Sequence, residues 1–321
     1  MIAGLPSAVL AALLLSHSLA SVAEEGGSGH YFPGSMSSFI DGVPAGETVI
    51  ARLNVLTYDG EFDSDIAVPI AGLAALDVEV KSKAVGLTGL WRPPVDLGER
   101  WSYAAAVTVP FIDLEVEADV GSPNDPLGRT IRRSDSASGL GDVLLLPFMV
   151  NYSVSPALNY NFRLGVYAPT GDYQKGQLAN QGKNFWTIEP TLAVIYLNPV
   201  TGREFSVFLG TDFNSENSDT DYKSGSQVHL EATASQHFPL WGGLGGIGVS
   251  GFWYEQVEGD SGDGATFGSF KARSTGVGPA VSWTGKMFGE DSVIEFKWLH
   301  ESGVRRRPEG DTLFLKAVFK F

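Results

Sequence analysis

The sequence contains no cysteine, which excludes disulfide bonds, thiol chemistry and cysteine-based metal sites. Basic residues are scarce: 22 Lys and Arg stand against 37 Asp and Glu, for a net charge of −15. Nucleic-acid phosphates require clustered Lys and Arg, so this balance argues against a nucleic-acid partner. After residue 23 no apolar run is long enough for a membrane-spanning helix. Glycine, by contrast, is abundant (39 residues), which suits many strands joined by turns.

The first 23 residues differ from the rest of the chain, because they are apolar and small. Ser21 to Ala23 supply the small residues that signal peptidase requires, and Glu24 follows at once, so we expect a signal peptide cleaved after Ala23. No Lys or Arg precedes the apolar run, which departs from the usual signal. A membrane anchor is the alternative, but the run is short and is interrupted by His17 and serines. The signal predicts export from the cytoplasm of a Gram-negative bacterium.

From about Thr48 onward, apolar and polar residues alternate with a period of two, which is typical of strands. The last ten residues show the pattern best. Their apolar face comprises Leu313, Leu315, Ala317, Phe319 and Phe321. A final strand that ends in phenylalanine resembles the C-terminal signal of outer-membrane barrels. We therefore interpret Phe319 and Phe321 as an assembly signal for the barrel-assembly machinery.

The lengths of the connections distinguish a membrane barrel from a soluble sandwich. Twelve strands are predicted, at 48–58, 80–91, 101–117, 142–154, 157–168, 185–197, 204–213, 226–237, 244–256, 273–285, 292–300 and 312–321. Short turns follow the even strands, whereas mostly longer polar loops such as 59–79 and 118–141 follow the odd ones. Outer-membrane barrels alternate in this way and have an even strand count. We expect an all-β fold: a transmembrane, antiparallel, up-and-down β-barrel of about 12 strands over residues 47–321, located in the outer membrane.

Some residues fit this pattern less well. The second predicted strand alternates poorly, and Pro110, Pro147, Pro190 and Pro279 fall inside predicted strands. Proline lacks the N–H that a ladder bond needs, so we expect bulges or shifted strand boundaries at these positions.

Three segments carry a family resemblance. They are residues 25–34 (EGGSGHYFPG), residues 139–142 (GLGD) with Leu144 and Pro147, and residues 165–173 (GVYAPTGDY). Together they resemble the family of outer-membrane proteins named for the meta-pathway of phenol degradation. The resemblance implies a barrel associated with uptake of hydrophobic or aromatic compounds. Read from the residues alone, GLGD is a turn in which Asp142 bonds local backbone, because no phosphate-binding Lys follows it.

Residues 24–46 precede the first strand and are rich in Gly, Ser and Pro. They form either a periplasmic leader or a plug inside the lumen. Twelve strands enclose more space than wall side chains fill, since eight strands already give a filled interior. In a plug, His30, Tyr31 and Phe32 would contact the lumen.

Polar residues on the other face of the strands are candidates for lining the lumen and selecting a solute. They are Arg52, Asn54, Asn159, Asn161, Arg163, Tyr167, Glu189, His229, Glu231, Glu295 and Lys297. Because both signs of charge occur, an interior network that holds the barrel rigid is an equal alternative. The acidic loops lack a 12-residue Ca²⁺ pattern, so no metal or cofactor is expected. Arg305 to Arg307 suit lipopolysaccharide phosphates in the surrounding lipid, and balancing the charges of Glu301, Glu309 and Asp311 is an equal alternative.

We expect a passive channel for a small hydrophobic or aromatic solute and no enzyme. A barrel hydrolase of the lipase or protease type is the first alternative, but the sequence shows no Gly-x-Ser-x-Gly elbow and no clear nucleophile–base pair. A structural or adhesive barrel is the second, supported only by the length of the outer loops.

Overall fold

A computed structural model describes residues 29–36, 38–44, 46–62, 67–121, 129–266 and 271–321. The predicted signal peptide lies outside the described residues. None of the described segments forms a helix long and apolar enough to cross a membrane. The elements are η2 (Phe39–Asp41), β1 (Thr48–Phe62), β2 (Val68–Ile70), β3 (Leu73–Arg92), β4 (Trp101–Gly121), β5 (Thr130–Leu140), β6 (Val143–Ser155), β7 (Leu158–Ala168), β8 (Thr187–Leu197), β9 (Arg203–Asn214), β10 (Gln227–Leu240), β11 (Gly243–Gln256), β12 (Arg273–Met287), β13 (Glu290–Arg305) and β14 (Glu309–Lys320).

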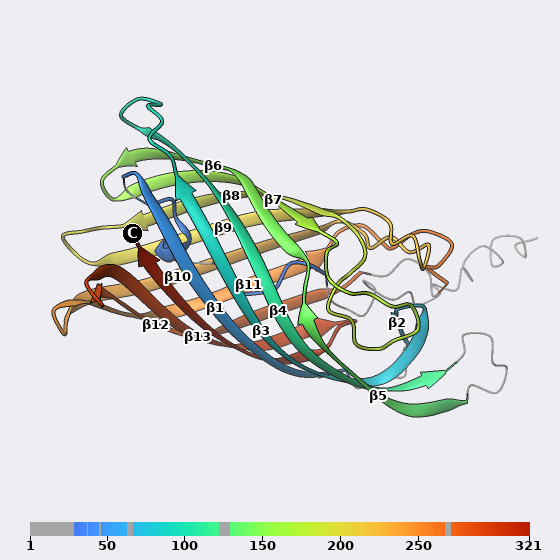
Figure 1. The fold of residues 1–321 in the computed structure, drawn as a ribbon. Helices are drawn as coiled ribbons and strands as arrows, with labels where there is room; N and C mark the ends of the chain where they lie inside the picture. Colours follow the sequence, from blue (N-terminus) through green and yellow to red (C-terminus); the bar gives the residue numbers. More distant parts are fainter. Residues whose placement is uncertain (1–28, 37, 45, 63–66, 122–128, 267–270) are drawn as a thin grey trace, which may run out of the picture.

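The strands form one antiparallel sheet that closes on itself (Figure 1). β1 pairs with both β3 and β14, and β3 pairs with β4, so the ring closes near the start of the barrel. Twelve strands make this ring, as the sequence predicted. The remaining two are β2, which pairs with the start of β3, and β5, which pairs with the outer half of β4.

The twelve predicted strands all form, with their ends shifted by a few residues. Short turns gather at the end of the barrel where the chain terminates, and the long loops gather at the other end (Figure 1). We call these the short-turn end and the long-loop end.

Two of the predicted loops are wrong in part, because they contain strands. Residues 59–79 hold the end of β1, β2 and the start of β3, and residues 118–141 hold the end of β4 and β5. β5 reads TIRRSDSASGL and has no apolar face, because it lies beyond the apolar band of the barrel as an extension of the β4 hairpin. A strand outside the apolar band needs no apolar face, so the alternation of apolar and polar residues did not predict β5.

Two of the four prolines that fall inside predicted strands lie where the ladder is irregular. Pro147 lies in a bulge, since the register shifts between Leu145 and Phe148. Pro110 lies where β4 exchanges β6 for β5 as its partner, and its carbonyl accepts the N–H of Gly141. Pro190 and Pro279 stay in register with their neighbours and need no bulge, which corrects the expectation at these two positions.

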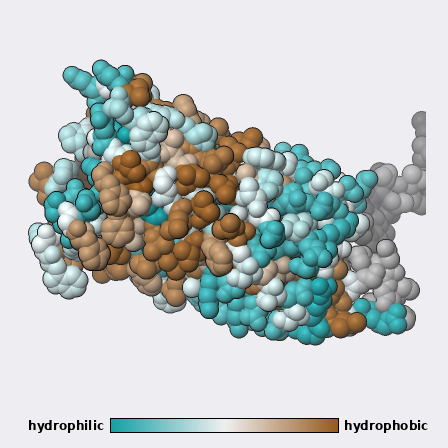
Figure 2. All heavy atoms as spheres, in the orientation of Figure 1, coloured by the Kyte–Doolittle hydropathy of each residue, from teal (hydrophilic) through white to brown (hydrophobic). Residues whose placement is uncertain are grey.

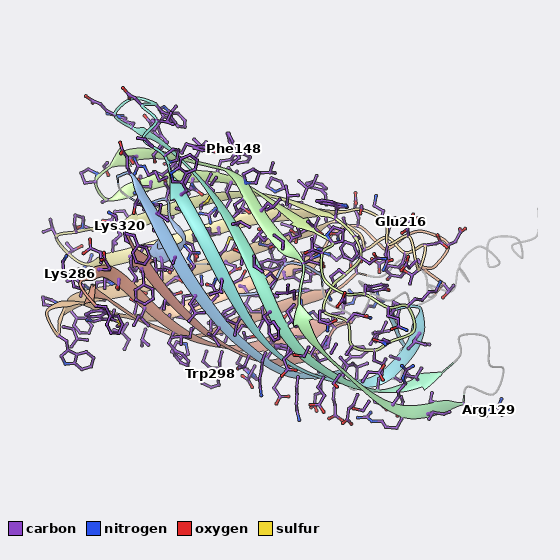
Figure 3. The ribbon with its side chains drawn as sticks, viewed as in Figure 1. Arg129, Phe148, Glu216, Lys286, Trp298 and Lys320 are labelled. Carbon is purple, nitrogen blue, oxygen red and sulfur yellow. The ribbon has the colours of Figure 1, made fainter. Side chains whose placement is uncertain are left out.

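On the face shown in Figure 2, apolar residues cover the middle of the barrel, while polar residues dominate the long-loop end. Phe148 and Trp298 project outward from the barrel wall, and Lys286 and Lys320 lie at the short-turn end (Figure 3). Exposed aromatic residues also flank the short turns, among them Trp91, Trp101, Trp241 and Phe288. An apolar band with an aromatic girdle is the surface that a barrel presents to lipid.

The described part of residues 24–46 lies inside the barrel. His30 contacts side chains near the long-loop end, and Asp41 contacts β1 and β14 before the chain enters β1 at the short-turn end. We call residues 29–46 the plug. It runs through the lumen as an irregular segment whose described residues include a single short helical turn, η2.

Candidate functional site: a plugged lumen beside an apolar cavity

A cavity of about 370 Å³ lies between the plug and one side of the barrel wall. Small lumen-facing residues on adjacent strands leave this space open: Ser82, Ala84, Gly86 and Thr88 on β3, and Ala106 and Thr108 on β4. Apolar side chains complete the wall: Leu56, Leu90, Ile112, Leu114, Leu144, Leu146, Met149 and Phe314. The alternation of β3 appeared poor because its lumen face is filled by small residues instead of strongly polar ones.

Charged residues hold the plug, and several of them, such as Arg52, Arg163 and Lys316, also border the cavity. The Asp41 carboxylate of the plug accepts hydrogen bonds from Lys316 Nζ at 2.8 Å and from Arg52 Nη1 at 2.9 Å. Arg163 Nη2 donates to the Asp41 backbone carbonyl at 2.7 Å. Asp41, Lys316 and Arg163 are buried and Arg52 is partly buried, so their pairing offsets the cost of removing each charge from water. Burial alone would raise the pKa of the Asp41 carboxyl, but the cations from β14, β1 and β13 outweigh it, and the pKa falls well below its usual range.

The plug backbone is bound in the same way further along. Lys297 Nζ donates to the carbonyl of Gly34 at 2.6 Å, and Glu204 accepts the backbone N–H of Phe39 at 2.7 Å. Glu231 accepts the hydroxyl of Tyr31 at 2.7 Å. An irregular segment has no ladder partners for its polar groups, so wall side chains satisfy them instead. The lumen charges therefore act largely as a network that fixes the plug.

His30 lies at the end of the plug nearest the long loops, where its two ring nitrogens contact side chains of the barrel wall. Nε2 lies 2.8 Å from Asp142 Oδ2, and Nδ1 lies 2.7 Å from Thr187 Oγ1. Asp142 also accepts the backbone N–H groups of Gly171 and Lys183, which are 29 and 41 residues away in the sequence. These contacts are not local, so the expectation that Asp142 bonds the backbone of its own turn is corrected: it ties this turn to the loop between β7 and β8. Burial lowers the pKa of the His30 imidazole, and this effect exceeds the opposing influence of Asp142.

The order Thr187–His30–Asp142 is that of a hydroxyl, a base and an orienting carboxylate, so the hydrolase alternative can be tested against it. Thr187 Oγ1 donates to Asn214 Oδ1 at 2.6 Å and is buried outside the cavity wall. A nucleophile needs its proton directed to the base and its oxygen open to substrate. Neither condition holds for Thr187, and the arrangement is that of a plug anchor.

The candidate residues predicted from the sequence fall into two groups. The residues that line the cavity are His30, Tyr31, Phe32, Arg52, Asn54, Arg163, Tyr167 and Glu189. The residues that face the lumen away from the cavity are Asn159, Asn161, His229, Glu231, Glu295 and Lys297. Of the assembly-signal pair, Phe319 is in β14, whereas Phe321 follows the strand and donates its N–H to the carbonyl of Val49.

Sequence reasoning missed several residues that shape the site. Asp41, Glu204 and Asp212 are buried acidic groups of the lumen. Glu204 and Asp212 occupy the inward-facing positions of the alternation in β9, so the period of two alone could have identified them as lumen residues. Asp41 lies outside any strand, and its only signal was an acid in a Gly- and Pro-rich segment.

Comparison with known proteins agrees with this architecture. The profile of the family described as "Putative MetA-pathway of phenol degradation" matches residues 63–317. An outer membrane channel from Pseudomonas putida F1 superimposes with a TM-score of 0.64 at 17% identity, covering 91% of this chain and 100% of that one. Its similarity shows the shared fold.

Two further barrels are more distant. The β domain of the Bordetella autotransporter BrkA gives a TM-score of 0.48 at 10% identity, covering 86% of this chain and 99% of that one. A FadL homologue from Pseudomonas aeruginosa gives 0.41 at 9%, covering 94% and 97%. No curated protein matches the chain.

Proposed function

Since the chain belongs to the family named for the MetA pathway of phenol degradation, we propose that it is an outer-membrane channel for small hydrophobic or aromatic molecules. The observation that carries this proposal is the cavity of about 370 Å³ beside the plug. Its volume falls within the range of small-molecule sites, and most of its wall is apolar.

The distribution of polarity inside the barrel favours an apolar solute over a polar one. The residues facing the cavity from β3, β4 and β6 are small or apolar, and the charged residues that also border it, Arg52, Arg163 and Lys316, are engaged with the plug. A hydrophilic solute would lose its hydration against the β3, β4 and β6 wall without regaining hydrogen bonds there. An aromatic hydrocarbon loses little there and gains dispersion contacts with Met149, Leu146 and Phe314.

The cavity also has a direction along the barrel. Asn180 and Lys183, in the loop between β7 and β8, line it near the long-loop end, and Leu90 and Met149 line it further toward the short turns. A smaller pocket of about 70 Å³ adjoins it through Val80 and Leu114 under the same loop. We propose that solute enters beneath this loop and passes along the plug.

Lipid and lipopolysaccharide around the apolar band, and the barrel-assembly machinery at the last strand, are the partners that this function requires. Their contribution here is a proposal that rests on the outer band and on the C-terminal Phe319 and Phe321.

The test is uptake by cells in which the chromosomal copy is deleted and then restored. At limiting concentration, deletion should slow uptake of a radiolabelled monocyclic aromatic compound several-fold, and restoration should return the rate. Uptake of a disaccharide should be unchanged. An aromatic uptake rate that is the same with and without the protein would overturn the proposal.

A further inference from the structure

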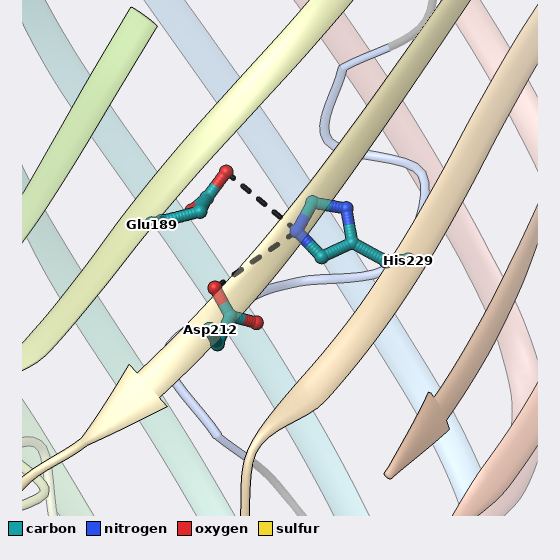
Figure 4. A group of neighbouring side chains, drawn as sticks. All are labelled: Glu189, Asp212 and His229. Carbon is teal, nitrogen blue, oxygen red and sulfur yellow. Dashed lines mark ion pairs between the residues drawn. The ribbon is translucent and has the colours of Figure 1, made fainter. Parts of the chain in front are cut away.

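Three buried side chains from adjacent strands converge on the polar side of the lumen: Glu189 of β8, Asp212 of β9 and His229 of β10 (Figure 4). One ligand atom from each lies within 4.8 Å of the other two. His229 Nε2 is 3.7 Å from Glu189 Oε1 and 3.9 Å from Asp212 Oδ1. The edge of the imidazole faces both carboxylates, so the three ligand atoms surround one point.

His229 is the unusual member of this cluster. Its side chain is 0% exposed, and among the described residues neither of its ring nitrogens makes a hydrogen bond. A buried polar group left without a partner destabilises the fold, and such groups are rare in native interiors. Glu189, in contrast, accepts hydrogen bonds from Tyr167 and Thr191. His229 therefore has two ring nitrogens available for a ligand, and the Glu189 carboxylate beside it is already oriented by hydrogen bonds.

Packing holds the imidazole in this position. Gly210 is the register partner of His229 on β9, and a Cβ at residue 210 would lie 2.2 Å from His229 Cε1. The ring therefore occupies space that only glycine leaves free. On the other face, the ring of Tyr31 stacks on it, with centroids 3.7 Å apart and planes 14° apart. The imidazole is thus held between the Gly210 backbone and the Tyr31 ring, and in this position its Nε2 faces the two carboxylates.

We propose that Glu189, Asp212 and His229 bind one divalent transition-metal ion of the zinc class. An imidazole nitrogen with two carboxylate oxygens is a ligand set for such ions, whereas Ca²⁺ takes six to eight oxygen ligands. Ligands about 2.0–2.2 Å from a tetrahedral ion lie roughly 3.4 Å from one another. The observed separations of 3.7 and 3.9 Å need to shorten by only a few tenths of an ångström.

Charge also favours a cation here. Both acidic members of the cluster, Glu189 and Asp212, are buried. Arg163 is near enough to act electrostatically on Glu189, but its Nη2 hydrogen bond goes to the Asp41 carbonyl of the plug, and Lys316 contacts the Asp41 carboxylate. A bound dication would balance the carboxylates in a region from which water is excluded.

Metal binding would have a consequence for the plug. Tyr31 of the plug stacks on the His229 imidazole and donates its hydroxyl to Glu231. A metal ion that fixes the imidazole would therefore also stabilise the position of this plug residue. Three protein ligands leave a fourth tetrahedral position for a water molecule or a solute oxygen. Glu189 lines the apolar cavity as well, which places the metal site next to the proposed path of solute.

The test uses the purified full-length barrel in detergent, treated with EDTA and dialysed, then titrated with Zn²⁺ by calorimetry and with Co²⁺ by visible absorption. We expect one ion per chain. His229→Phe keeps the ring that stacks on Tyr31 but removes both nitrogens, and Asp212→Asn removes a charge; each should weaken binding at least 100-fold. Gly210→Ala should also weaken it, because the methyl group displaces the imidazole.

His237→Gln is the matched control. His237 is also buried in the lumen, but its Nε2 lies 2.9 Å from Glu204 and it is not part of the cluster, so His237→Gln should leave binding unchanged. Heat-modifiable gel migration reports that each variant is folded. Absence of stoichiometric Zn²⁺ binding by the folded wild-type protein below about 100 μM would overturn the proposal, as would wild-type affinity in folded His229→Phe. Neither result depends on solute uptake, so this proposal can fail independently of the channel function.

Discussion

The Lys316 ammonium on the last strand lies 2.8 Å from the Asp41 carboxylate of the plug, although 275 residues separate them in the sequence. Both groups are buried, and Arg52 shares the same carboxylate. One contact thus joins the start of the described chain, the first strand and the last strand. It fixes the plug against the polar wall and leaves the apolar wall free to border the cavity.

Asp41→Asn should release the plug. The substitution leaves the buried Lys316 and the partly buried Arg52 without their counter-charge, which costs about 3 kcal/mol and corresponds to roughly a 100-fold shift toward the released state. We expect more frequent or larger conductance steps in planar bilayers. Asp59→Asn is the control, because Asp59 is exposed on the outer part of β1. Identical conductance in Asp41→Asn and in the wild type would contradict the role given to this ion pair.

The barrel itself was predictable from the sequence, because lipid on one side and the lumen on the other impose a period of two on every spanning strand. Leu313 and Leu315 face outward, and Thr312 and Lys316 face inward, as the alternation predicts. β5 escaped prediction because it extends beyond the apolar band and has no such constraint.

The site was predictable only in part. Periodicity assigns a side chain to the lumen face, but it does not say which lumen residues meet across the barrel. The convergence of Glu189, Asp212 and His229 depends on the register between β8, β9 and β10 and on the absence of a side chain at Gly210. The plug contacts depend on the path of an irregular segment, for which the sequence carries no period.

Acidification should weaken the contacts of His30 that hold the plug near the long-loop end of the barrel. The pKa of His30 is lowered from 6.5 by burial, with Asp142 opposing and Lys183 reinforcing this shift; the Thr187 hydroxyl and the Tyr167 and Phe185 rings also contact the imidazole. The pKa of Asp142 is also lowered, since His30 and two backbone N–H groups outweigh its burial.

A group with a lowered pKa in the plugged state takes up a proton more readily when released, so stability is lost as pH falls. For His30 the loss begins below about pH 6.5 and is at most tenfold per pH unit. We expect more channel opening at pH 5.5 than at pH 7.5, with a smaller difference in His30→Gln. An unchanged pH response in His30→Gln would assign the effect to other groups.

A charge on the lipid-facing wall should destabilise the barrel. Leu192 lies midway along β8 and is 59% exposed on the outer surface. Leu192→Arg should lower the free energy of unfolding by about 2–4 kcal/mol in a bilayer. Val200, which is 91% exposed in a short turn, is the control, and Val200→Arg should have an effect of less than about 1 kcal/mol. Equal effects in urea titrations of the two variants would contradict the placement of the membrane band.

Phe321 should matter for assembly more than for stability. Its side chain is 66% exposed beyond β14, and its backbone bonds the barrel through the N–H to the Val49 carbonyl and through the carbonyl to the Thr48 hydroxyl. Phe321→Ala keeps both bonds, so the unfolding free energy of the refolded protein should change by less than about 0.5 kcal/mol. The amount of folded barrel in the outer membrane should fall several-fold, as measured by heat-modifiable migration. Normal amounts in cells would remove the case for Phe321 as an assembly signal.

The most direct test of the cavity as the solute path is the initial rate of uptake of a monocyclic aromatic compound by cells producing Ala84→Phe or Ala51→Phe. Both changes add the same side chain, but Ala84 lines the cavity and Ala51 lies on the outer face of β1. With equal amounts of folded barrel, we predict that Ala84→Phe lowers the rate several-fold and that Ala51→Phe leaves it unchanged. Equal rates in the two variants would contradict the account.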